Sequence, residues 1–172
     1  MSKKIIIIGS RHGKYNTTVM VAKKGLYFKV IKKGDIGGVC TNRGCIPSKA
    51  LLSIAEEIDE IKGAKRDGIT VDIKDIDFGR VMGKKDRAVK MSRRGIEQLL
   101  DENDVEVIKE EASLIDSNKV KISSGETIDS DYVIVATGSK PISLPNMEID
   151  EENILSSKGA LNLEEIPDSL LV

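Results

Sequence analysis

The first part of the chain alternates short apolar runs with an amphipathic segment. Residues 5–8 are four consecutive isoleucines that end at Gly9, and residues 27–31 form a second, mostly apolar stretch. The amphipathic segment lies between them and extends to about residue 24. Continuous apolar runs of this length are typical of strands that are buried in a parallel sheet. The succession of strand, turn, helix and strand therefore predicts the βαβ unit of a Rossmann-like α/β fold.

Two longer segments carry apolar residues at helical spacing, and each is predicted to form a helix. The first extends to about residue 64, and its apolar positions are predicted to pack in the core: Leu51, Ala55, Ile58 and Ile61. The second begins after Asp77, a residue type that commonly caps helix N-termini, and extends to about Leu100. Its basic runs at residues 84–87 and 93–94 are predicted to form a solvated face.

Several short strands are predicted in the second half of the chain. Strand-like composition, interrupted by turn residues, occurs at residues 105–108, 112–115, 119–122 and 127–128. Short strands joined by such turns predict a small antiparallel meander. Another apolar strand, at residues 132–138, ends in a glycine and suits the centre of a parallel sheet. A further strand is predicted to begin at residues 170–172.

Length and charge narrow the class of protein. The 172 residues suit one domain, and aromatic residues make up only 3%, so the core must be mostly aliphatic. The 27 basic and 28 acidic residues give a net charge of −1, which predicts neither nucleic acid nor an anionic membrane as a partner. The apolar run near the start is too short for a signal peptide or a membrane span, so a cytoplasmic location is expected.

Both cysteines lie in one glycine-rich stretch, residues 37–49. Four residues separate Cys40 from Cys45, so the two thiols can form a disulfide across a short loop. Two buried thiols or half of a metal site are the alternatives. A closed zinc site needs four ligands, however, and only His12 could add a nitrogen. A permanent structural disulfide is unusual in a chain without an export signal. A reversible redox pair is therefore the favoured interpretation.

The run G-G-V-C-T-N-R-G-C-I-P-S-K-A-L-L closely resembles the redox-disulfide signature of the pyridine nucleotide-disulfide oxidoreductases. These enzymes are flavoproteins, and the I-P-S-K-A-L-L ending is most similar to the dihydrolipoamide dehydrogenase branch. The A-T-G at residues 136–138 matches the place where the family passes close to its cofactor. The resemblance implies that residues 1–172 form the N-terminal FAD-binding domain, incomplete and truncated before the NAD-binding and interface domains.

The resemblance also implies a role for each site residue. Cys40 would exchange with lipoamide or another small disulfide, Cys45 would face the flavin, and Lys49 would stand near the flavin ring. Electrons would pass from dihydrolipoamide through the Cys40–Cys45 disulfide to FAD. They would then pass to NAD, which the family binds in a domain that residues 1–172 do not include. The other implied cofactor contacts are Gly9, Lys32, Gly38, Ala112, Thr137 and Gly138. The full-length family forms homodimers.

The chain departs from the family pattern around the first turn. Of the fingerprint G-x-G-x-x-G only Gly9 is kept, and Arg11 and Lys14 replace the second and third glycines. Lys32 stands where the family has an acid, and an ammonium group cannot accept hydrogen bonds from a ribose. Glu110 occupies a position that is often glycine. The departures in the first turn and at Lys32 predict impaired FAD binding.

Three functions are compatible with these residues. The first is an FAD-dependent disulfide oxidoreductase of the dihydrolipoamide dehydrogenase type, present here as an N-terminal part that would not turn over alone. The second is a non-catalytic fragment or decayed copy with impaired FAD binding, and the third is a flavin-free thiol–disulfide protein. A P-loop at residues 9–14 would be one residue short of its motif. A 2′-phosphate contact by Lys32 and acid–base work by His12 are further alternatives, although His12 has no evident partner.

Overall fold

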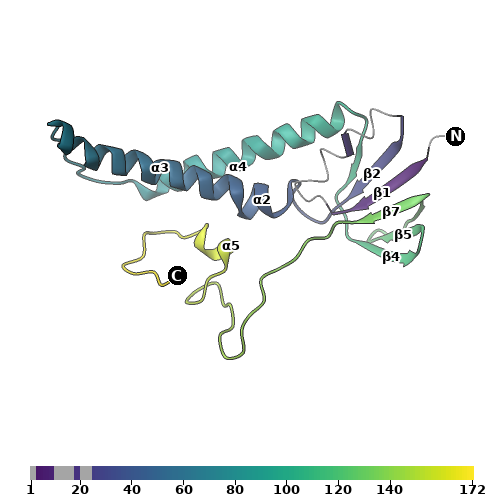
Figure 1. Cartoon of the computed structure of the whole chain (residues 1–172). Helices are drawn as coiled ribbons and strands as arrows, with labels where there is room; N and C mark the ends of the chain where they lie inside the picture. Colours follow the sequence, from purple (N-terminus) through teal and green to yellow (C-terminus); the bar gives the residue numbers. More distant parts are fainter. Residues whose placement is uncertain (1–2, 10–17, 20–24) are drawn as a thin grey trace. The chain divides into compact units, whose positions relative to one another are not determined.

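Figure 1 shows the computed structural model of the chain, which describes residues 3–9, 18–19 and 25–172. The chain divides into two compact units, residues 1–42 with 91–140 and residues 43–90 with 141–172. The strands of the first unit are β1 (Lys4–Ile8), β2 (Tyr27–Ile31), β3 (Glu106–Ile108), β4 (Ala112–Asp116), β5 (Lys119–Ile122), β6 (Thr127–Asp129) and β7 (Tyr132–Val135). The second unit holds α3 (Cys45–Gly63), the 3₁₀ helix η1 (Ala64–Asp67) and α5 (Ser157–Ala160). The boundary between the units falls within α2 (Gly38–Arg43) and within α4 (Phe78–Asp101).

A four-stranded parallel sheet organises the first unit, in the order β3-β2-β1-β7. The strands predicted at residues 5–8 and 27–31 are confirmed. The strand predicted at residues 132–138 forms as β7, but it lies at an edge of the sheet and none of its four residues is buried, so its predicted place as a buried strand at the centre is wrong. Beyond the ladder, Gly9 N donates to the Ile31 carbonyl at 2.8 Å, and Ala136 N donates to the Ile8 carbonyl at 2.7 Å. Most of the helix predicted between β1 and β2 lies outside the described residues.

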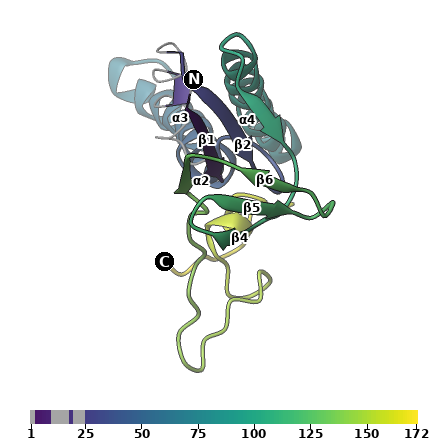
Figure 2. The same cartoon turned by 90° about the vertical axis from the view of Figure 1, so that its right-hand side faces the viewer.

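Both faces of this sheet are covered within the first unit. Because side chains alternate along a strand, successive isoleucines of β1 point to opposite faces. One face packs Ile7, Phe28 and Val30 against residues of helical segments: Val19, Ile96 and Leu100. The other face packs Ile6, Ile8 and Ile31 against the meander residues Val120, Ile122 and Ile128. Figure 2 shows the meander strands lying across the sheet. The core is therefore almost wholly aliphatic, as the composition predicts.

The meander itself contains three antiparallel strands, in the order β4-β5-β6. The segment 105–108, which the turn pattern places with the meander, instead forms β3 and pairs parallel with β2. This placement is a correction, and its cause is the long-range pairing of Val30 with Val107, which no local turn signal encodes. Glu110 accepts hydrogen bonds from Ser123 Oγ at 2.9 Å and Ser124 N at 2.7 Å, so it holds the turn between β5 and β6.

A charged cluster joins β3 to β2. The carboxylate of Glu106 accepts hydrogen bonds from Lys29 Nζ at 3.0 Å and from the Tyr27 hydroxyl at 2.7 Å. The pKa of Glu106 lies below its ordinary value of 4.5. The hydrogen bond from Lys29 is the largest cause of this lowering, and the hydrogen bond from Tyr27 is the next. A carboxyl whose pKa is lowered by folding stabilises the protein above its unfolded pKa. That stabilisation disappears as the pH falls through the folded pKa.

We expect Glu106→Gln to cost about 0.5 kcal/mol of unfolding free energy at pH 7 and almost nothing at pH 3, because the side chain is 44% exposed and solvent screens the pair. Urea unfolding at the two pH values measures this difference. Glu56→Gln, at an exposed α3 position without an ion pair in the described residues, is the control. An equal loss at both pH values would contradict the prediction.

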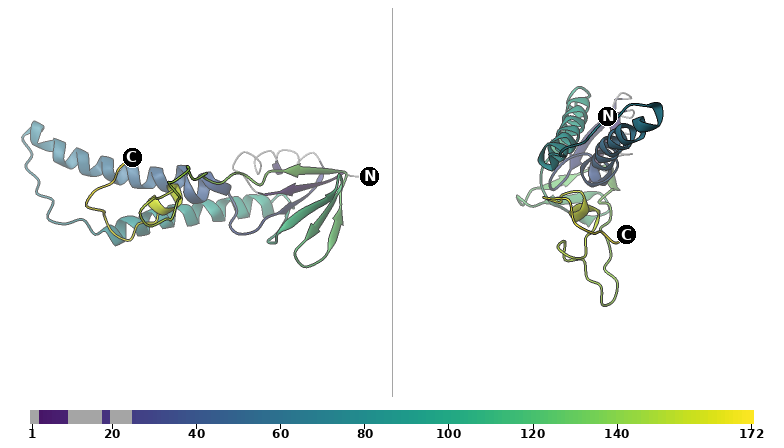
Figure 3. Two further views of the ribbon diagram at one scale, coloured as in Figure 1. Left: turned by 90° about the horizontal axis from the view of Figure 1, so that it is seen from below. Right: turned by 90° about the vertical axis from the view of Figure 1, so that its left-hand side faces the viewer.

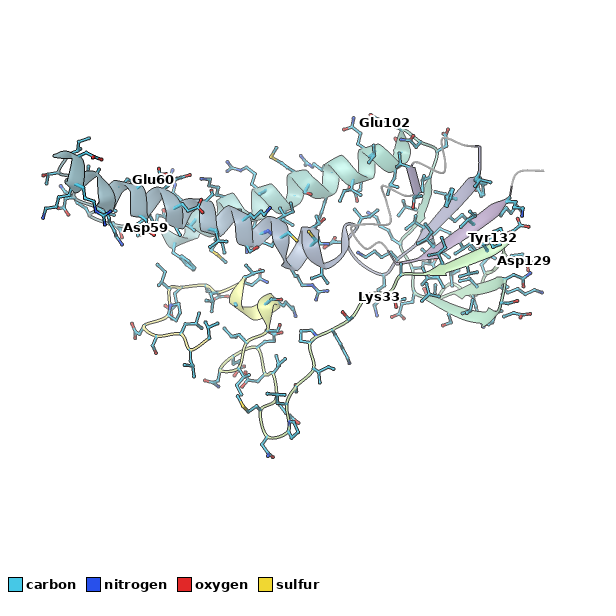
Figure 4. All side chains as sticks on the ribbon, viewed as in Figure 1. Lys33, Asp59, Glu60, Glu102, Asp129 and Tyr132 are labelled. Atoms are coloured by element: carbon cyan, nitrogen blue, oxygen red, sulfur yellow. The ribbon has the colours of Figure 1, made fainter. Side chains whose placement is uncertain are left out.

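The second unit contains α3 and the first half of α4, which run side by side in Figures 1 and 3. Glu57 of α3 pairs with Lys84 of α4 at 3.1 Å. Both predicted helices are confirmed, and Asp77 caps α4 by accepting a hydrogen bond from Arg80 N at 2.9 Å. Figure 4 shows charged side chains such as Asp59 projecting from α3.

The solvated face predicted for residues 84–87 is wrong at Lys85, which is only 3% exposed. Its ammonium group donates to the Leu161 carbonyl at 2.7 Å and pairs with Asp86 at 3.0 Å. Lys85 precedes the buried Val89 by four residues, so both lie on one face of α4. Arg93, four residues further on, is also partly buried.

The core packing predicted for α3 is also wrong. Leu51 and Ile58 are only half-buried, and Ala55 and Ile61 are exposed. Throughout residues 43–90 and 141–172, all of which are described, the buried apolar residues are Pro47 and Val89. This unit therefore lacks a second apolar layer for α3 to pack against.

Residues 170–172 form no strand, and no strand among the described residues pairs with them; the prediction for this segment is therefore wrong. Within the described residues, no helix combines the length and the apolar character needed to cross a membrane.

Candidate functional site

The segment after β2 carries both cysteines. Cys40 lies in the short helix α2, and Cys45 is the first residue of α3. Both cysteines are disulfide-bonded, which agrees with the Cys40–Cys45 pair predicted from the sequence. Cys40 is half-buried and Cys45 is exposed.

The start of α3 places Cys45 in a distinct electrostatic setting. The preceding residue, Gly44, is the N-cap and has no side chain that could accept hydrogen bonds from the first turn. Ser48 Oγ instead donates to the Gly44 carbonyl at 2.8 Å. The positive end of the α3 dipole therefore favours negative charge on the Cys45 sulfur. Lys49 follows one turn later and is exposed.

Several predicted cofactor contacts lie at the carboxyl ends of the parallel strands, the edge at which α/β folds bind ligands. Gly9 follows β1, Lys32 follows β2, and Thr137 and Gly138 follow β7. Thr137 and Gly138 are exposed, and Gly138 has a φ of +82°. Gly9 has a φ of +98°, and a Cβ at this position would lie 2.2 Å from the Ala136 carbonyl oxygen. Only glycine fits this close approach.

The other predicted contacts are placed elsewhere in the same unit. Gly38 begins α2, with a φ of +67°, and is half-buried. Ala112 begins β4 and packs against the cluster below the sheet. Lys32 Nζ donates to the Asp35 carbonyl within the same loop. Lys33, labelled in Figure 4, pairs with Glu111.

Gly9 and the exposed residues after β7 are compatible with a dinucleotide at this edge of the sheet, whereas Lys32 offers no acceptor for a ribose hydroxyl. The Thr41 hydroxyl is buried and has no hydrogen-bond partner among the described residues. Arg11, His12 and Lys14, which carry the altered fingerprint and the P-loop alternative, lie outside the described residues.

Three polar residues around Cys40 were not singled out by the sequence patterns. Asn42 Nδ2 donates to the carbonyls of Ile36 at 2.9 Å and Gly38 at 2.8 Å, and its Oδ1 accepts from Arg93 Nε. Arg93 also pairs with Asp35, with 2.9 Å between Nη2 and Oδ2. The spacing of Arg93 from Val89 and Ile96, four and three residues away on the buried face of α4, is the signal that could have identified it.

Comparisons with known proteins agree with this geometry. The family model described as pyridine nucleotide-disulphide oxidoreductase matches residues 3–172. The chain is similar to dihydrolipoyl dehydrogenase from Geobacillus stearothermophilus, with 40% identity over 97% of this chain and 36% of the relative. The corresponding enzyme of Chlamydia muridarum is 38% identical, over 97% of this chain and 37% of the relative.

Among solved structures, LpdA from Mycobacterium tuberculosis superposes with a TM-score of 0.84 at 26% identity, covering 96% of this chain and 38% of that chain. The chain thus spans about a third of the length of the curated relatives it matches. The redox signature, the sheet and the family match lead to one conclusion: the chain belongs to the pyridine nucleotide-disulphide oxidoreductase family.

Proposed function

We propose that the chain is the N-terminal, FAD-binding part of a disulfide oxidoreductase of the dihydrolipoamide dehydrogenase type. The observation that carries the proposal is the disulfide that joins Cys40 of α2 to Cys45 at the start of α3. Residues 1–172 act as one FAD-binding domain in this proposal. Lipoamide as substrate, NAD as final electron acceptor, a homodimeric assembly and a cytoplasmic location belong to the same proposal.

The chemistry of the cysteine pair is thiol–disulfide exchange. A thiolate of the substrate dithiol attacks Sγ of Cys40, the S–S bond breaks, and Cys45 leaves with the electron pair as a thiolate. The second substrate thiol loses its proton and attacks the substrate sulfur of the mixed disulfide. It thereby closes the substrate disulfide and releases the Cys40 thiolate. The substrate loses two electrons, and the cysteine pair gains them.

The choice of Cys40 as the attacked sulfur follows from the leaving group. A more stable thiolate leaves faster, and the N-terminus of α3 stabilises the Cys45 thiolate. Exposure does not favour this choice, since Cys45 is the more exposed of the two. The argument therefore depends on the helix terminus and on the family resemblance.

FAD is held in this proposal by residues at the carboxyl edge of the sheet and near the redox pair: Gly9, Lys32, Gly38, Lys49, Ala112, Thr137 and Gly138. When bound, FAD accepts the electron pair from the reduced dithiol. Gly9 allows the close backbone approach, and the exposed Thr137 and Gly138 can contact a ligand without rearrangement of β7. The charge of Lys49 favours an anionic group nearby.

Flavin retention tests the proposal. After incubation with FAD and removal of free cofactor by gel filtration, we expect the chain to retain a visible flavin band. Lys32→Glu should strengthen binding by about tenfold, because a carboxylate accepts hydrogen bonds from the ribose hydroxyls. Lys33→Glu, one residue further on, is the matched control. Loss of flavin by both the natural chain and Lys32→Glu would contradict the proposal and support a non-catalytic or flavin-free protein.

The purified chain is expected to form no NADH from dihydrolipoamide, because it covers only about a third of the dihydrolipoyl dehydrogenases it resembles. The readout is NADH absorbance with NAD and excess dihydrolipoamide present. Measurable lipoamide-dependent NADH formation would show that these residues suffice for turnover.

A further inference from the structure

A network of three polar side chains holds the segment that contains Cys40. Asp35 lies before Cys40 in the loop, and Asn42 lies after it in α2. Arg93 of α4 binds both: Nη2 pairs with the Asp35 carboxylate at 2.9 Å, and Nε donates to Asn42 Oδ1. All three residues belong to the first unit. One guanidinium group thus anchors the chain on both sides of the redox cysteine.

Asn42 transmits this anchor to the backbone of the loop. With its oxygen facing Arg93, its amide nitrogen donates to the carbonyls of Ile36 at 2.9 Å and Gly38 at 2.8 Å. These two carbonyls lie between Asp35 and Cys40. Because the amide nitrogen can only donate and the amide oxygen can only accept, these partners fix the orientation of the Asn42 amide. Loss of Arg93 would leave the Asn42 oxygen without its charged donor.

We infer that Arg93 is a positioning residue for the redox pair, one that stabilises the disulfide form by holding Cys40 in place through Asp35 and Asn42. The inference rests on the proposed function, in which Cys40–Cys45 is the reversible redox disulfide. Two sites that stabilise one another do so reciprocally. A network that holds Cys40 in place when the disulfide is formed therefore favours the disulfide over the dithiol. It also limits the freedom of Cys40 in the dithiol form, which lowers the entropy that is lost when the disulfide closes.

The test is the thiol–disulfide equilibrium of the whole chain with a glutathione redox buffer, measured by acid quenching and counting of free thiols. Arg93→Met should lower the equilibrium constant for disulfide formation by about fivefold, at the lower end of typical coupling effects. Arg94→Met is the matched control. Arg94 is exposed on the same helix, and its side chain forms no ion pair or hydrogen bond with any residue that the structure describes. Its equilibrium constant should remain that of the natural chain.

Asp35→Asn provides a milder second variant, since the Asp35 side chain is 61% exposed and the change is nearly isosteric. It should shift the equilibrium in the same direction, and its effect should not add to that of Arg93→Met, because both remove one anchor. If the equilibrium constant for disulfide formation in Arg93→Met were within twofold of that of the natural chain, this inference would be overturned, whereas the proposed function would stand. A natural chain that forms no reversible disulfide would overturn the proposed function as well.

Discussion

Replacing Gly9 by alanine is expected to destabilise the first unit by about 3 kcal/mol or more. The new Cβ would lie 2.2 Å from the carbonyl oxygen and 2.6 Å from the carbonyl carbon of Ala136. Both are backbone atoms, so no side-chain rotation relieves the overlap, and overpacking of this kind costs about 1–3 kcal/mol. The φ of +98° adds about 1–2 kcal/mol for a residue with a Cβ. A shift of β1 would also strain the bonds of Gly9 N and Ala136 N to their carbonyl partners.

The control for this substitution is Gly125→Ala. Gly125 has nearly the same φ, +97°, and lies in the same unit, but a Cβ there meets nothing within 4 Å. It should cost only the conformational part, about 1–2 kcal/mol. Urea unfolding of both variants, followed by circular dichroism, gives the difference. If the two variants lost the same stability, the close approach of Gly9 to β7 would be disproved.

Replacing either cysteine by serine is expected to abolish the oxidation of a dithiol by the chain. The oxidised natural chain, mixed with reduced lipoamide, should yield an equimolar amount of lipoamide disulfide without any flavin, because the exchange needs only a thiolate and an accessible disulfide. Cys40→Ser and Cys45→Ser retain one thiol each and have no disulfide to reduce, so each should yield none. The double variant, Cys40→Ser with Cys45→Ser, sets the background. Dithiol oxidation by a single variant would contradict the assignment of the redox pair.

The two serine variants should also differ from one another. The thiol that remains in Cys40→Ser is Cys45, at the N-terminus of α3. It should react with iodoacetamide at neutral pH about two- to fivefold faster than Cys40 in Cys45→Ser, which corresponds to a helix-terminus contribution of about 0.3–1 kcal/mol. Equal or reversed rates would remove the physical reason for treating Cys45 as the leaving group.

The parts of the fold that follow from local patterns could be predicted. The isoleucine run of β1 identifies a buried parallel strand, the apolar run of β7 identifies a strand of the same sheet, and Asp77 marks the start of α4. The redox pair follows from the spacing and context of Cys40 and Cys45. In each case the signal lies within a few consecutive residues.

The features that were missed depend on contacts between distant residues. β3 belongs to the parallel sheet because Val107 pairs with Val30, far away in the sequence. Arg93 reaches Asn42 across 51 residues. Lys85 stands in a basic run, and its hydrogen bond to the carbonyl of Leu161, a distant residue, is a contact that accompanies its burial. Local charge patterns cannot reveal such partners, although helical spacing from Val89 indicates the correct face.

The uneven distribution of buried side chains has a consequence for how the chain unfolds. Both aliphatic clusters lie in the first unit, whereas Pro47 and Val89 are the buried apolar residues of the second. Cooperativity comes from the simultaneous loss of many packed contacts, and hydrogen exchange reports it region by region. The first unit should therefore melt as one cooperative block, while the helices of residues 43–90 open at lower free energy. The dependence of the unfolding free energy on urea concentration is then mainly a property of the sheet, since it scales with the surface that unfolding exposes.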